Sequence, residues 1–397
     1  MNREDFPMLK QNIIYFDNGA TTFKPKSVID SMNDYYSNYS ANAHRGDYDI
    51  SYKVDVTYEN ARKNVANFIN ADSDEIIFTS GSTDSLNMIA NGFFDKYLEP
   101  GDEILLSYAE HASNVLPWFQ LAKTKGVVIK FIELDNNNHI TVNNCIKMIT
   151  NKTKVISLAH ITNVVGDTRP IKEICEYAHR NNIFVVVDGA QSVPHMKTDV
   201  KELDCDFLAF SAHKMLGPTG VGVLYGKKEL LEHIEPTRLG GGMNESFDNV
   251  NEVYLKELPI RLEAGTQNIA GVIGLSAAID YIRKVGIEEI NLHEIKLKKY
   301  LVDKLKKLDH IHLINEEADS GIVSFTVDDV FPQDLAYYLN KYHICVRAGN
   351  HCAKILKEEI GIKNTVRISL YLYNTYEELD KLVDLLKDKD KIIKEMI

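Results

Sequence analysis

The feature that most constrains this chain is a series of apolar, strand-like runs separated by helical stretches across residues 75–226. The runs are EIIFTSG (75–81), DEILLSYAEH (102–111), VVIKFIEL (127–134), KVISLAHITN (154–163), IFVVVDGAQ (183–191), DFLAFSAHK (206–214) and VGVLYG (221–226). Several are continuous and rich in β-branched residues, which is typical of strands buried on both faces. With helical stretches such as 171–182 between them, they predict a doubly wound α/β domain.

The pattern of apolar and polar residues changes past about residue 280. A long amphipathic helix is expected over 286–308, followed by the short apolar runs IVSFTV, ICVRAG and VRISL and a charged terminal helix. This mixture predicts a smaller α+β domain. We therefore expect a large domain over residues 16–280 and a small domain built from residues 1–15 and 281–397.

Charge and composition exclude several classes of function. The net charge of −12 disfavours wholesale binding to nucleic acid, and there is no basic stripe with interleaved aromatic residues. No apolar run approaches the roughly 20 residues that a membrane span needs, and the first residues, MNREDFPMLKQ, do not resemble a secretory leader. We expect a cytoplasmic protein. Its five cysteines form no CxxC pair, so free thiols and no metal site are expected.

Polar residues follow the predicted strands of the large domain. Ser82 and Thr83 begin a helix after one strand, and Asp188 and Lys214 follow two others. Taken alone, Ser82 could be a helix cap, Asp188 an ion-pair member and Lys214 a surface lysine. Ligands bind at the carboxyl ends of strands in open α/β sheets, so these positions can converge. A carboxylate, a lysine and a helix-terminal anion site are together what pyridoxal phosphate (PLP) needs.

The chain resembles the class V aminotransferase-like PLP enzymes of fold type I and, within them, cysteine desulfurases of the SufS/Csd type. The resemblance is carried by YFDNGATTFKPKSVID (15–30), NAHRGDY (42–48), EHASNVLPW (110–118), HITNVVGDTRPI (160–171), VDGAQSVPH (187–195), FSAHKMLGPTGVGVLYG (210–226), LGGGM (239–243), EAGTQN (263–268), RAGNHCA (347–353) and VRISLYLYNT (366–375). It implies a mainly parallel seven-stranded sheet flanked by helices, with a smaller α+β C-terminal domain.

The resemblance also implies roles for individual residues. Lys214 would form the covalent link to PLP, Asp188 would pair with the ring nitrogen, and His111 would stack on the ring. The remaining implied contacts are Gln191 near the ring hydroxyl, Ser82, Thr83, Ser211 and His213 at the phosphate, and Thr266 reaching the phosphate of a second subunit. Asn163 and Arg367 would hold the substrate carboxylate, and Arg347 would also bind the substrate.

The stretch RAGNHCAK (347–354) places Cys352 in a short loop before Arg367. From the residues alone, this thiol could be a core residue, a ligand or a nucleophile. The resemblance makes it the nucleophile, and the short loop predicts a fixed and sheltered side chain. Arg347, His351 and Lys354 could each favour its thiolate form.

The expected reaction converts L-cysteine to L-alanine and leaves sulfur on Cys352 as a persulfide, for iron–sulfur cluster assembly or another sulfur pathway. The resemblance further implies a homodimer and a sulfur-acceptor or scaffold protein. A selenocysteine lyase, or another class V lyase or aminotransferase, is the alternative enzyme. A scaffold without turnover is disfavoured because Lys214, Asp188, Cys352 and Arg367 are all present.

Overall fold

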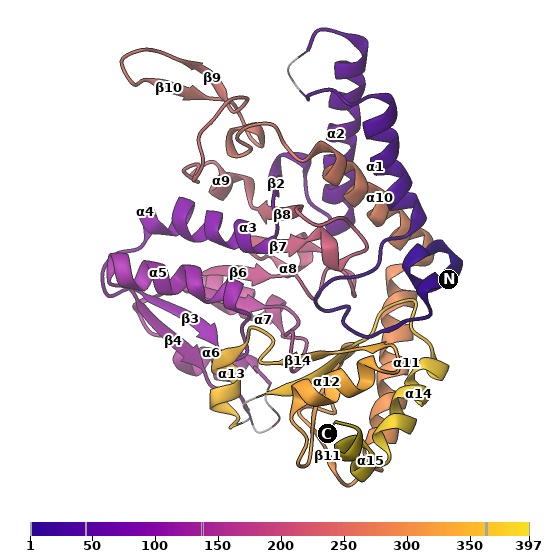
Figure 1. Ribbon diagram of the computed structural model, residues 1–397. Coiled ribbons are helices and arrows are strands. Elements are labelled where there is room, and N and C mark those ends of the chain that lie inside the picture. The colour runs from indigo at the N-terminus through magenta and orange to yellow at the C-terminus, as the bar shows by residue number, and fades with distance from the viewer. Residues whose placement is uncertain (1, 44–45, 136, 138, 362–363, 397) are drawn as a thin grey trace.

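The computed structural model describes residues 2–43, 46–135, 137, 139–361 and 364–396. Residues 44 and 45 of the NAHRGDY stretch therefore lie outside the described residues. Figure 1 shows the indigo, magenta and pink part of the chain around a large sheet, and the orange and yellow part around a second sheet below it. The N-terminus lies beside the boundary between the two parts.

The large sheet has seven strands in the order β2-β8-β7-β6-β5-β3-β4. Their bounds are β2 Ile76–Thr79, β3 Glu103–Ser107, β4 Val128–Ile132, β5 Thr153–Ala159, β6 Phe184–Asp188, β7 Phe207–Ser211 and β8 Gly222–Gly226. Strands β4, β3, β5, β6 and β7 are parallel, whereas β8 pairs antiparallel with both β2 and β7. The predicted mainly parallel seven-stranded sheet is confirmed, and each strand falls within a predicted run except β5, which begins one residue earlier, at Thr153.

Burial on both faces explains why these strands are continuously apolar. Successive residues of one strand belong to different hydrophobic clusters: Leu208 packs with one and Ala209 with the other. The first cluster lies under α1 (Lys26–Asn38), α2 (Asp49–Ile69), α7 (Ile171–Arg180) and α10 (Ile269–Val285). The second lies under α3 (Ser82–Met88), η4 (Ile89–Phe94) and α5 (Leu116–Lys125). Each face of the sheet is thus covered by helices.

The second sheet has four strands in the order β11-β12-β15-β14. Their bounds are β11 Ile311–Leu313, β12 Ile322–Val327, β14 Arg347–Gly349 and β15 Thr365–Ser369. Its core is shared with the helices α11 (Ile287–Leu305), α12 (Pro332–Asn340), α14 (Tyr376–Leu386) and α15 (Lys389–Met396). Strand β1 (Ile14–Tyr15) pairs in parallel with β13 (Ile344–Cys345), which joins the start of the chain to this region. The boundaries near residues 15 and 280 stay predictions.

The smaller elements connect these layers. They are η1 Arg3–Asp5, η2 Pro7–Gln11, η3 Ser73–Glu75, α4 Asp95–Tyr97, η5 Ala112–Asn114, α6 Val142–Met148, α8 Val200–Leu203, η6 Ala212–Lys214, α9 Lys228–Leu231, β9 Asn244–Phe247, β10 Val253–Leu255, η7 Ile260–Leu262 and α13 Lys354–Glu359. The β9–β10 hairpin projects from the upper part of the molecule in Figure 1. None of the described helices combines the length and apolarity required to cross a bilayer.

Candidate active site

A cavity of about 380 Å³ lies where the carboxyl ends of β5, β6 and β7 face the second sheet. Eleven of the predicted site residues line it: Ser82, Thr83, His111, Asn163, Asp188, Gln191, Ser211, His213, Lys214, Arg347 and Arg367. Thr266 instead lines a neighbouring cavity of about 240 Å³, which shares Ser80, Asp84 and Gly220 with the first. Cys352 is not among the lining residues, although the preceding His351 is.

Lys214 and Asp188 form the buried base of this cavity. Burial lowers the pKa of Lys214 to about 8, against the opposing pull of Asp188. Burial likewise raises the pKa of Asp188, while Lys214 and the backbone N–H of Ala190, which donates to Oδ1 at 3.0 Å, act to lower it. A buried amine with a lowered pKa is a competent nucleophile and base near neutral pH.

Hydroxyl groups gather at the N-terminus of α3. Ser211 Oγ accepts from the Ser82 backbone N–H at 2.8 Å and lies 3.0 Å from Ser82 Oγ. Thr83 Oγ1 is 2.7 Å from Ser113 Oγ. The cap position belongs to Gly81, and no side chain caps this helix, so the interpretation of Ser82 as a helix cap is wrong. Free N–H groups and hydroxyls at a helix start suit a phosphate.

His111 is held as a neutral ring. Its Nδ1 accepts from the backbone N–H of Ser113 at 3.1 Å, and burial, followed by the charge of Lys214, lowers its pKa to about 4. Burial, again with Lys214 as the next cause, also lowers the pKa of His213 to about 4. Both imidazoles are therefore uncharged at neutral pH, which suits ring stacking better than anion binding.

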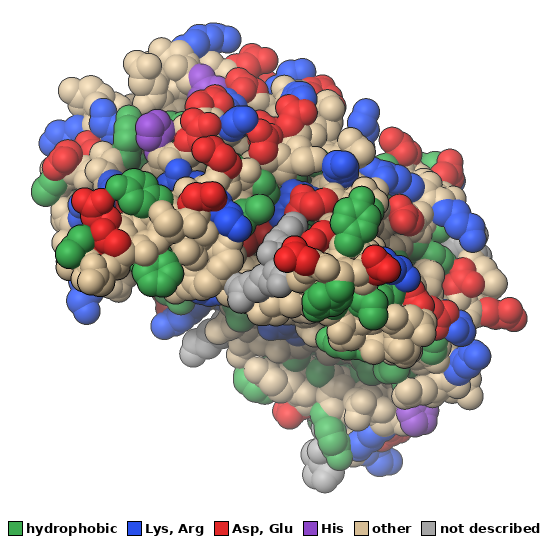
Figure 2. Space-filling view, turned by 90° about the horizontal axis from the view of Figure 1, so that it is seen from above, with side chains coloured by type: hydrophobic (Ala, Val, Ile, Leu, Met, Phe, Trp, Pro, Cys, Tyr) green, Lys and Arg blue, Asp and Glu red, His purple; other side chains and the backbone are tan. Residues whose placement is uncertain are grey.

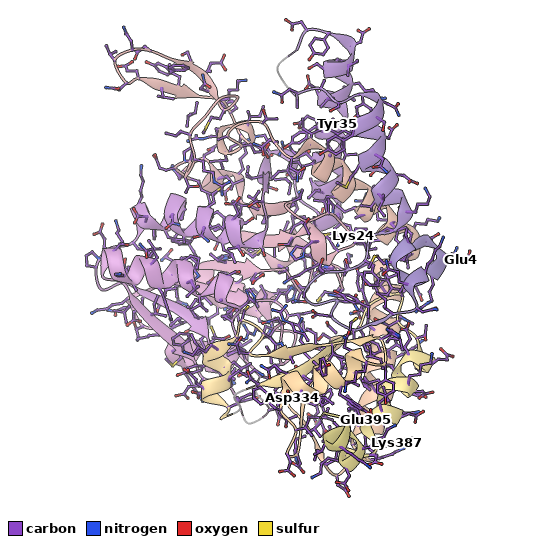
Figure 3. The ribbon with its side chains drawn as sticks, viewed as in Figure 1. Glu4, Lys24, Tyr35, Asp334, Lys387 and Glu395 are labelled. Carbon is purple, nitrogen blue, oxygen red and sulfur yellow. The ribbon has the colours of Figure 1, made fainter. Side chains whose placement is uncertain are left out.

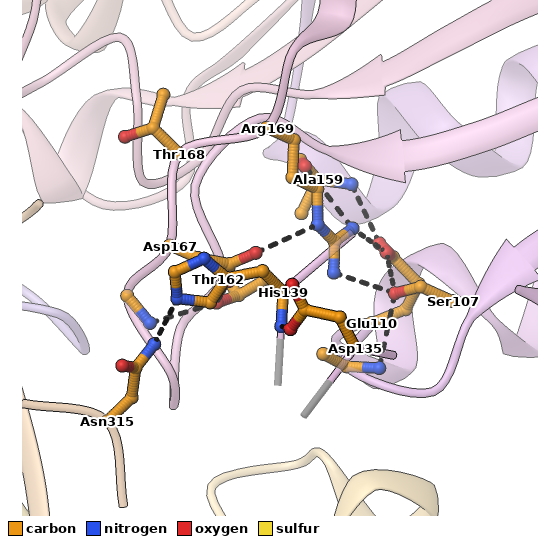
Figure 4. Close-up of polar contacts among 12 residues, drawn as sticks. Ser107, Glu110, Asp135, His139, Ala159, Thr162, Asp167, Thr168, Arg169 and Asn315 are labelled. Carbon is orange, nitrogen blue, oxygen red and sulfur yellow. Dashed lines mark hydrogen bonds and ion pairs between the residues drawn. The ribbon is translucent and has the colours of Figure 1, made fainter. Parts of the chain in front are cut away.

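A buried ion pair joins Glu110, the residue before His111, to Arg169 (Figure 4). Arg169 donates to Glu110 through Nη1 and to Ser107 Oγ through Nη2, the latter at 2.7 Å. The Glu110 carboxylate also accepts from Asn114 Nδ2 at 2.7 Å and from the backbone N–H of Ala159 at 2.8 Å. The Arg169 and Glu110 side chains are both 0% exposed. This network joins the loop of His111 to the end of β5, and sequence reasoning missed it.

The backbone carbonyl of His213, next to Lys214, has several donors. Lys24, labelled in Figure 3, donates to it at 3.1 Å, and the Thr22 backbone N–H donates at 2.9 Å. Thr21 Oγ1 donates at 3.1 Å. The ATTFKP stretch of the sequence thus fixes the turn that carries Lys214. That stretch was part of the resemblance, but nothing in its pattern identified this contact.

Two arginines face each other on the opposite side of the cavity. Arg347 on β14 and Arg367 on β15 are cross-strand partners, an arrangement that like charges normally destabilise. Arg367 donates to Asp17 Oδ1 at 2.9 Å and to the Asn163 carbonyl at 3.0 Å. Burial lowers the pKa of Arg367. The Asp17 carboxylate raises this pKa and the Arg347 charge lowers it, so that it stays below its usual range. An anion placed between the two guanidinium groups would relieve this repulsion.

Cys352 lies in a tight turn at the edge of the cavity. His351 (φ 53°) and Cys352 (φ 58°) both adopt left-handed backbone conformations. The turn is held by Asn163 Nδ2, which donates to the His351 carbonyl at 2.8 Å, and by the Ala112 N–H, which donates to the Cys352 carbonyl at 2.9 Å. The predicted fixed loop stays a prediction, which these hydrogen bonds support, but the Cys352 side chain is exposed, so the expectation of a sheltered thiol is wrong for the single chain.

The three candidate neighbours of the thiol differ. Arg347 Nη2 lies 4.0 Å from Cys352 Sγ. Burial, followed by the charge of Arg367, lowers the pKa of His351 to about 2, so its ring carries no charge at neutral pH. The Lys354 side chain is 78% exposed and pairs with Glu358 at 3.6 Å. Of the three, Arg347 is the cation in contact with the sulfur. All five cysteines are free thiols, as predicted.

The residues present fit PLP. Four buried polar atoms of the cavity lining have no partner among the described residues: Asn163 Oδ1, Gln191 Oε1, His351 Nδ1 and Arg367 Nε. Orphaned polar atoms in a concave site are expected to be satisfied by a polar ligand. Lys214 and Asp188 can hold its carbonyl carbon and ring nitrogen, and the hydroxyls of Ser82, Thr83 and Ser211 can hold its phosphate.

Comparison with known proteins gives a consistent answer. Residues 14–382 match the family described as Aminotransferase class-V. A probable cysteine desulfurase from Halalkalibacterium halodurans is 44% identical over 95% of this chain and 94% of its own length. The apo structure of the cysteine desulfurase from Thermococcus onnurineus NA1 is 39% identical, with a TM-score of 0.93 over 97% of this chain and 96% of that one.

The cysteine desulfurase CsdA from Escherichia coli is also similar, with 36% identity and a TM-score of 0.93 over 100% of this chain and 98% of that one. These matches span nearly the whole length of each protein, so they include both sheets and the loop of Cys352. The chain belongs to the class-V aminotransferase family and, within it, to the cysteine desulfurases.

Proposed function

We propose that this chain is a PLP-dependent cysteine desulfurase that converts L-cysteine to L-alanine and retains the sulfur on Cys352. The observation that carries this proposal is the position of an exposed thiol in a fixed turn beside a cavity whose base holds Lys214 and Asp188. A class V aminotransferase or kynureninase-like enzyme would have no need of that thiol.

The cofactor and Lys214 would share the work at the substrate carbon. When bound, PLP withdraws electrons from the substrate Cα and makes its proton acidic. Lys214 is half-buried, and its pKa of about 8 lets it take up a proton near neutral pH once its amine is free. Asp188 supplies a buried negative charge where the ring nitrogen must stay protonated.

The substrate carboxylate would lie between Arg347 and Arg367. The unpartnered Nε of Arg367 is a donor available for this purpose. Asn163 donates its amide N–H to the His351 carbonyl and presents Oδ1, an acceptor, to the cavity. Asn163 therefore suits the amino group of the substrate better than its carboxylate, which falls to the two arginines.

Cys352 would carry out the sulfur transfer. Its thiolate attacks the sulfur of the substrate, the bond between that sulfur and the substrate Cβ breaks, and Cβ keeps the electron pair. Cβ then takes up a proton, Cα regains the proton that Lys214 removed, and L-alanine is released. The thiol of Cys352 and the substrate thiol together become one persulfide, so no external oxidant is needed. Arg347, 4.0 Å from Sγ, is placed to stabilise the attacking anion.

Alanine release from L-cysteine in the presence of a reductant tests this proposal. We expect wild-type protein with PLP to be active, Cys352→Ala to lose desulfurase turnover while keeping the cofactor absorbance, and Lys214→Ala to lose both turnover and the native cofactor spectrum. Full activity in Cys352→Ala would show that Cys352 is not the nucleophile. If Cys352→Ala loses cysteine turnover but retains selenocysteine cleavage, the proposed role of Cys352 stands, and both cysteine and selenocysteine stay candidates for the physiological substrate.

We also propose a homodimer. Large apolar side chains are exposed on the β9–β10 hairpin, where Phe247 is 72% and Tyr254 58% exposed, and at the start of α2, where Tyr52 is 70% exposed. Figure 2 displays hydrophobic side chains among mixed acidic and basic ones on the face seen from above. Burial of such residues commonly drives association. Light scattering should give a mass of two chains, and Phe247→Asp with Tyr254→Asp should reduce it; a wild-type monomer would refute this.

An acceptor protein is proposed to remove the sulfur, because the Cys352 side chain is exposed and thus accessible to another protein's thiol. Persulfide transfer to such a thiol conserves both sulfur atoms and needs no metal. The five free thiols are consistent with a reducing, cytoplasmic setting. Multiple turnover without any thiol acceptor would argue against this part of the proposal.

A further inference from the structure

Lys357 on α13 is a buried lysine with no acidic partner among the described residues. Its side chain is 3% exposed, and its one hydrogen bond in that part of the chain is to Thr365 Oγ1, at 2.7 Å. Burial, followed by the charge of Arg367, lowers the pKa of Lys357 to about 8. Burying an amine in this way is costly.

The same hydroxyl connects Lys357 to the turn of Cys352. His351 Nε2 lies 2.9 Å from Thr365 Oγ1 and 3.2 Å from the Thr365 carbonyl oxygen. His351 precedes Cys352 and shares its left-handed conformation. Two successive residues in this region are costly for non-glycine side chains, and they persist only where the surroundings hold them. The His351 ring is one of the groups that hold this turn.

The donors and acceptors of Lys357, Thr365 and His351 determine which of their atoms carry the hydrogens. Lys357 donates to Thr365 Oγ1 and carries no acceptor when charged. The Thr365 carbonyl oxygen can only accept, so His351 Nε2 carries the hydrogen and donates to this oxygen and to Thr365 Oγ1. A neutral ring that is protonated at Nε2 leaves Nδ1 as an acceptor. His351 Nδ1 is buried, has no partner among the described residues and belongs to a side chain that lines the cavity.

We propose that Lys357 is a positioning residue that acts through Thr365: it fixes the Thr365 hydroxyl beside the Nε2–H of His351, so that His351 holds the Cys352 turn and presents Nδ1, an acceptor, to a donor atom of the substrate. This inference rests on the proposed function for its substrate. It assigns to the pair Lys357 and Thr365 the task of keeping His351 in one orientation.

The test compares Lys357→Met, Thr365→Val and the double variant, with Thr365→Ser as the conservative rescue. Lys298→Met is the matched control, because Lys298 is also buried, also has a pKa lowered to about 8 by burial, and donates to the Ala318 carbonyl instead. All variants are compared at equal folded fraction, measured by thermal unfolding.

We expect Lys357→Met and Thr365→Val each to lower kcat/KM for L-cysteine roughly tenfold, the loss of one hydrogen bond to a charged or reacting group. The double variant should lose no more than either single one, since both break one chain of contacts. Thr365→Ser and Lys298→Met should stay close to wild type. Amide hydrogen exchange over residues 349–353 should be faster in Lys357→Met and Thr365→Val only.

The inference is overturned if Lys357→Met behaves as Lys298→Met does in both kcat/KM and exchange, or if the two single losses multiply in the double variant. Hydrogen exchange needs no turnover. If wild-type protein does not act on L-cysteine, the proposed function fails, and the exchange of residues 349–353 alone then decides whether Lys357 and Thr365 hold the turn.

Discussion

The two sides of the cavity are built differently. On the large-sheet side, Lys214 and Asp188 follow buried strands, and the neighbouring Glu110 and Arg169 side chains are 0% exposed. On the small-sheet side, Cys352 is exposed in a left-handed turn held by a few hydrogen bonds. The first side is part of the folding core and can hold a cofactor rigidly, whereas the second presents a reactive sulfur to the substrate and to other molecules. Substitutions in the buried ion pair of the first side should mainly reduce stability, and those around Cys352 on the second side should mainly reduce activity.

The largest expected effect is on the rigid side. Glu110→Gln removes the nearer of the two carboxylates that pair with the buried Arg169 and leaves Asp167 Oδ2 at 3.7 Å, so we expect the free energy of unfolding to fall by about 3 kcal/mol. Glu202→Gln, which breaks the exposed pair with Lys172 at 3.3 Å, should cost about 1 kcal/mol or less. Urea unfolding of both variants measures the difference. Equal stability of the two would show that the Glu110 network does not hold this side together.

The next effect concerns pH. Burial lowers the pKa of Lys214 to about 8, so its amine loses its proton at a lower pH than an ordinary lysine does. The neutral, nucleophilic fraction therefore rises as the pH rises toward 8, roughly tenfold per pH unit, and then levels off. The rate at which apo-protein binds PLP covalently, followed by absorbance, should show this plateau. A rate that keeps rising to pH 10, as for a free lysine, would contradict the burial argument.

A smaller effect is expected on the exposed side. Arg347→Leu removes the guanidinium that lies opposite Arg367 and 4.0 Å from Cys352 Sγ. We expect kcat/KM for L-cysteine to fall about tenfold or more, with unchanged urea unfolding, since a hydrogen bond to a charged group is lost. Steady-state kinetics and urea unfolding of the same preparation measure the change in kcat/KM and the change in stability. A loss of stability without a loss of activity would contradict the claim that the residues around Cys352 serve activity and not stability.

The smallest effect should come from Lys354. Its side chain is 78% exposed and pairs with Glu358 on its own helix. Lys354→Ala should therefore change kcat/KM less than about twofold, because exposed ion pairs contribute little. This variant is the counterpart of Arg347→Leu. If Lys354→Ala impaired persulfide formation as strongly as Arg347→Leu, the assignment of Arg347 as the cation that acts on the thiol would be wrong.

More of the large-sheet side of the cavity than of the small-sheet side could be predicted from the sequence. The seven strands could be predicted because residues buried on both faces must be apolar, and Asp188 and Lys214 stand out directly after them. The pairing of Arg367 with Asp17, and its position opposite Arg347, could not be predicted. These contacts join segments far apart in the chain, and no local pattern of apolar residues encodes them.

The exposed side also depends on backbone conformation that composition does not reveal. Nothing in RAGNHCAK indicates that His351 and Cys352 are both left-handed, since neither is a glycine. The turn exists because Asn163 and Ala112, from the other sheet's loops, donate to its carbonyls. The exposure of Cys352 follows from that turn and not from the length of the loop.

The central claim is that sulfur moves from L-cysteine to Cys352, and the mass of the Cys352 peptide tests it most directly. PLP-loaded protein is mixed with L-cysteine without reductant, the thiols are alkylated and the peptide is analysed by mass spectrometry. The account predicts that this peptide gains one sulfur atom, in step with the alanine released, while the peptides of the buried Cys145, Cys175 and Cys205 do not. Release of alanine with an unmodified Cys352 peptide would contradict it.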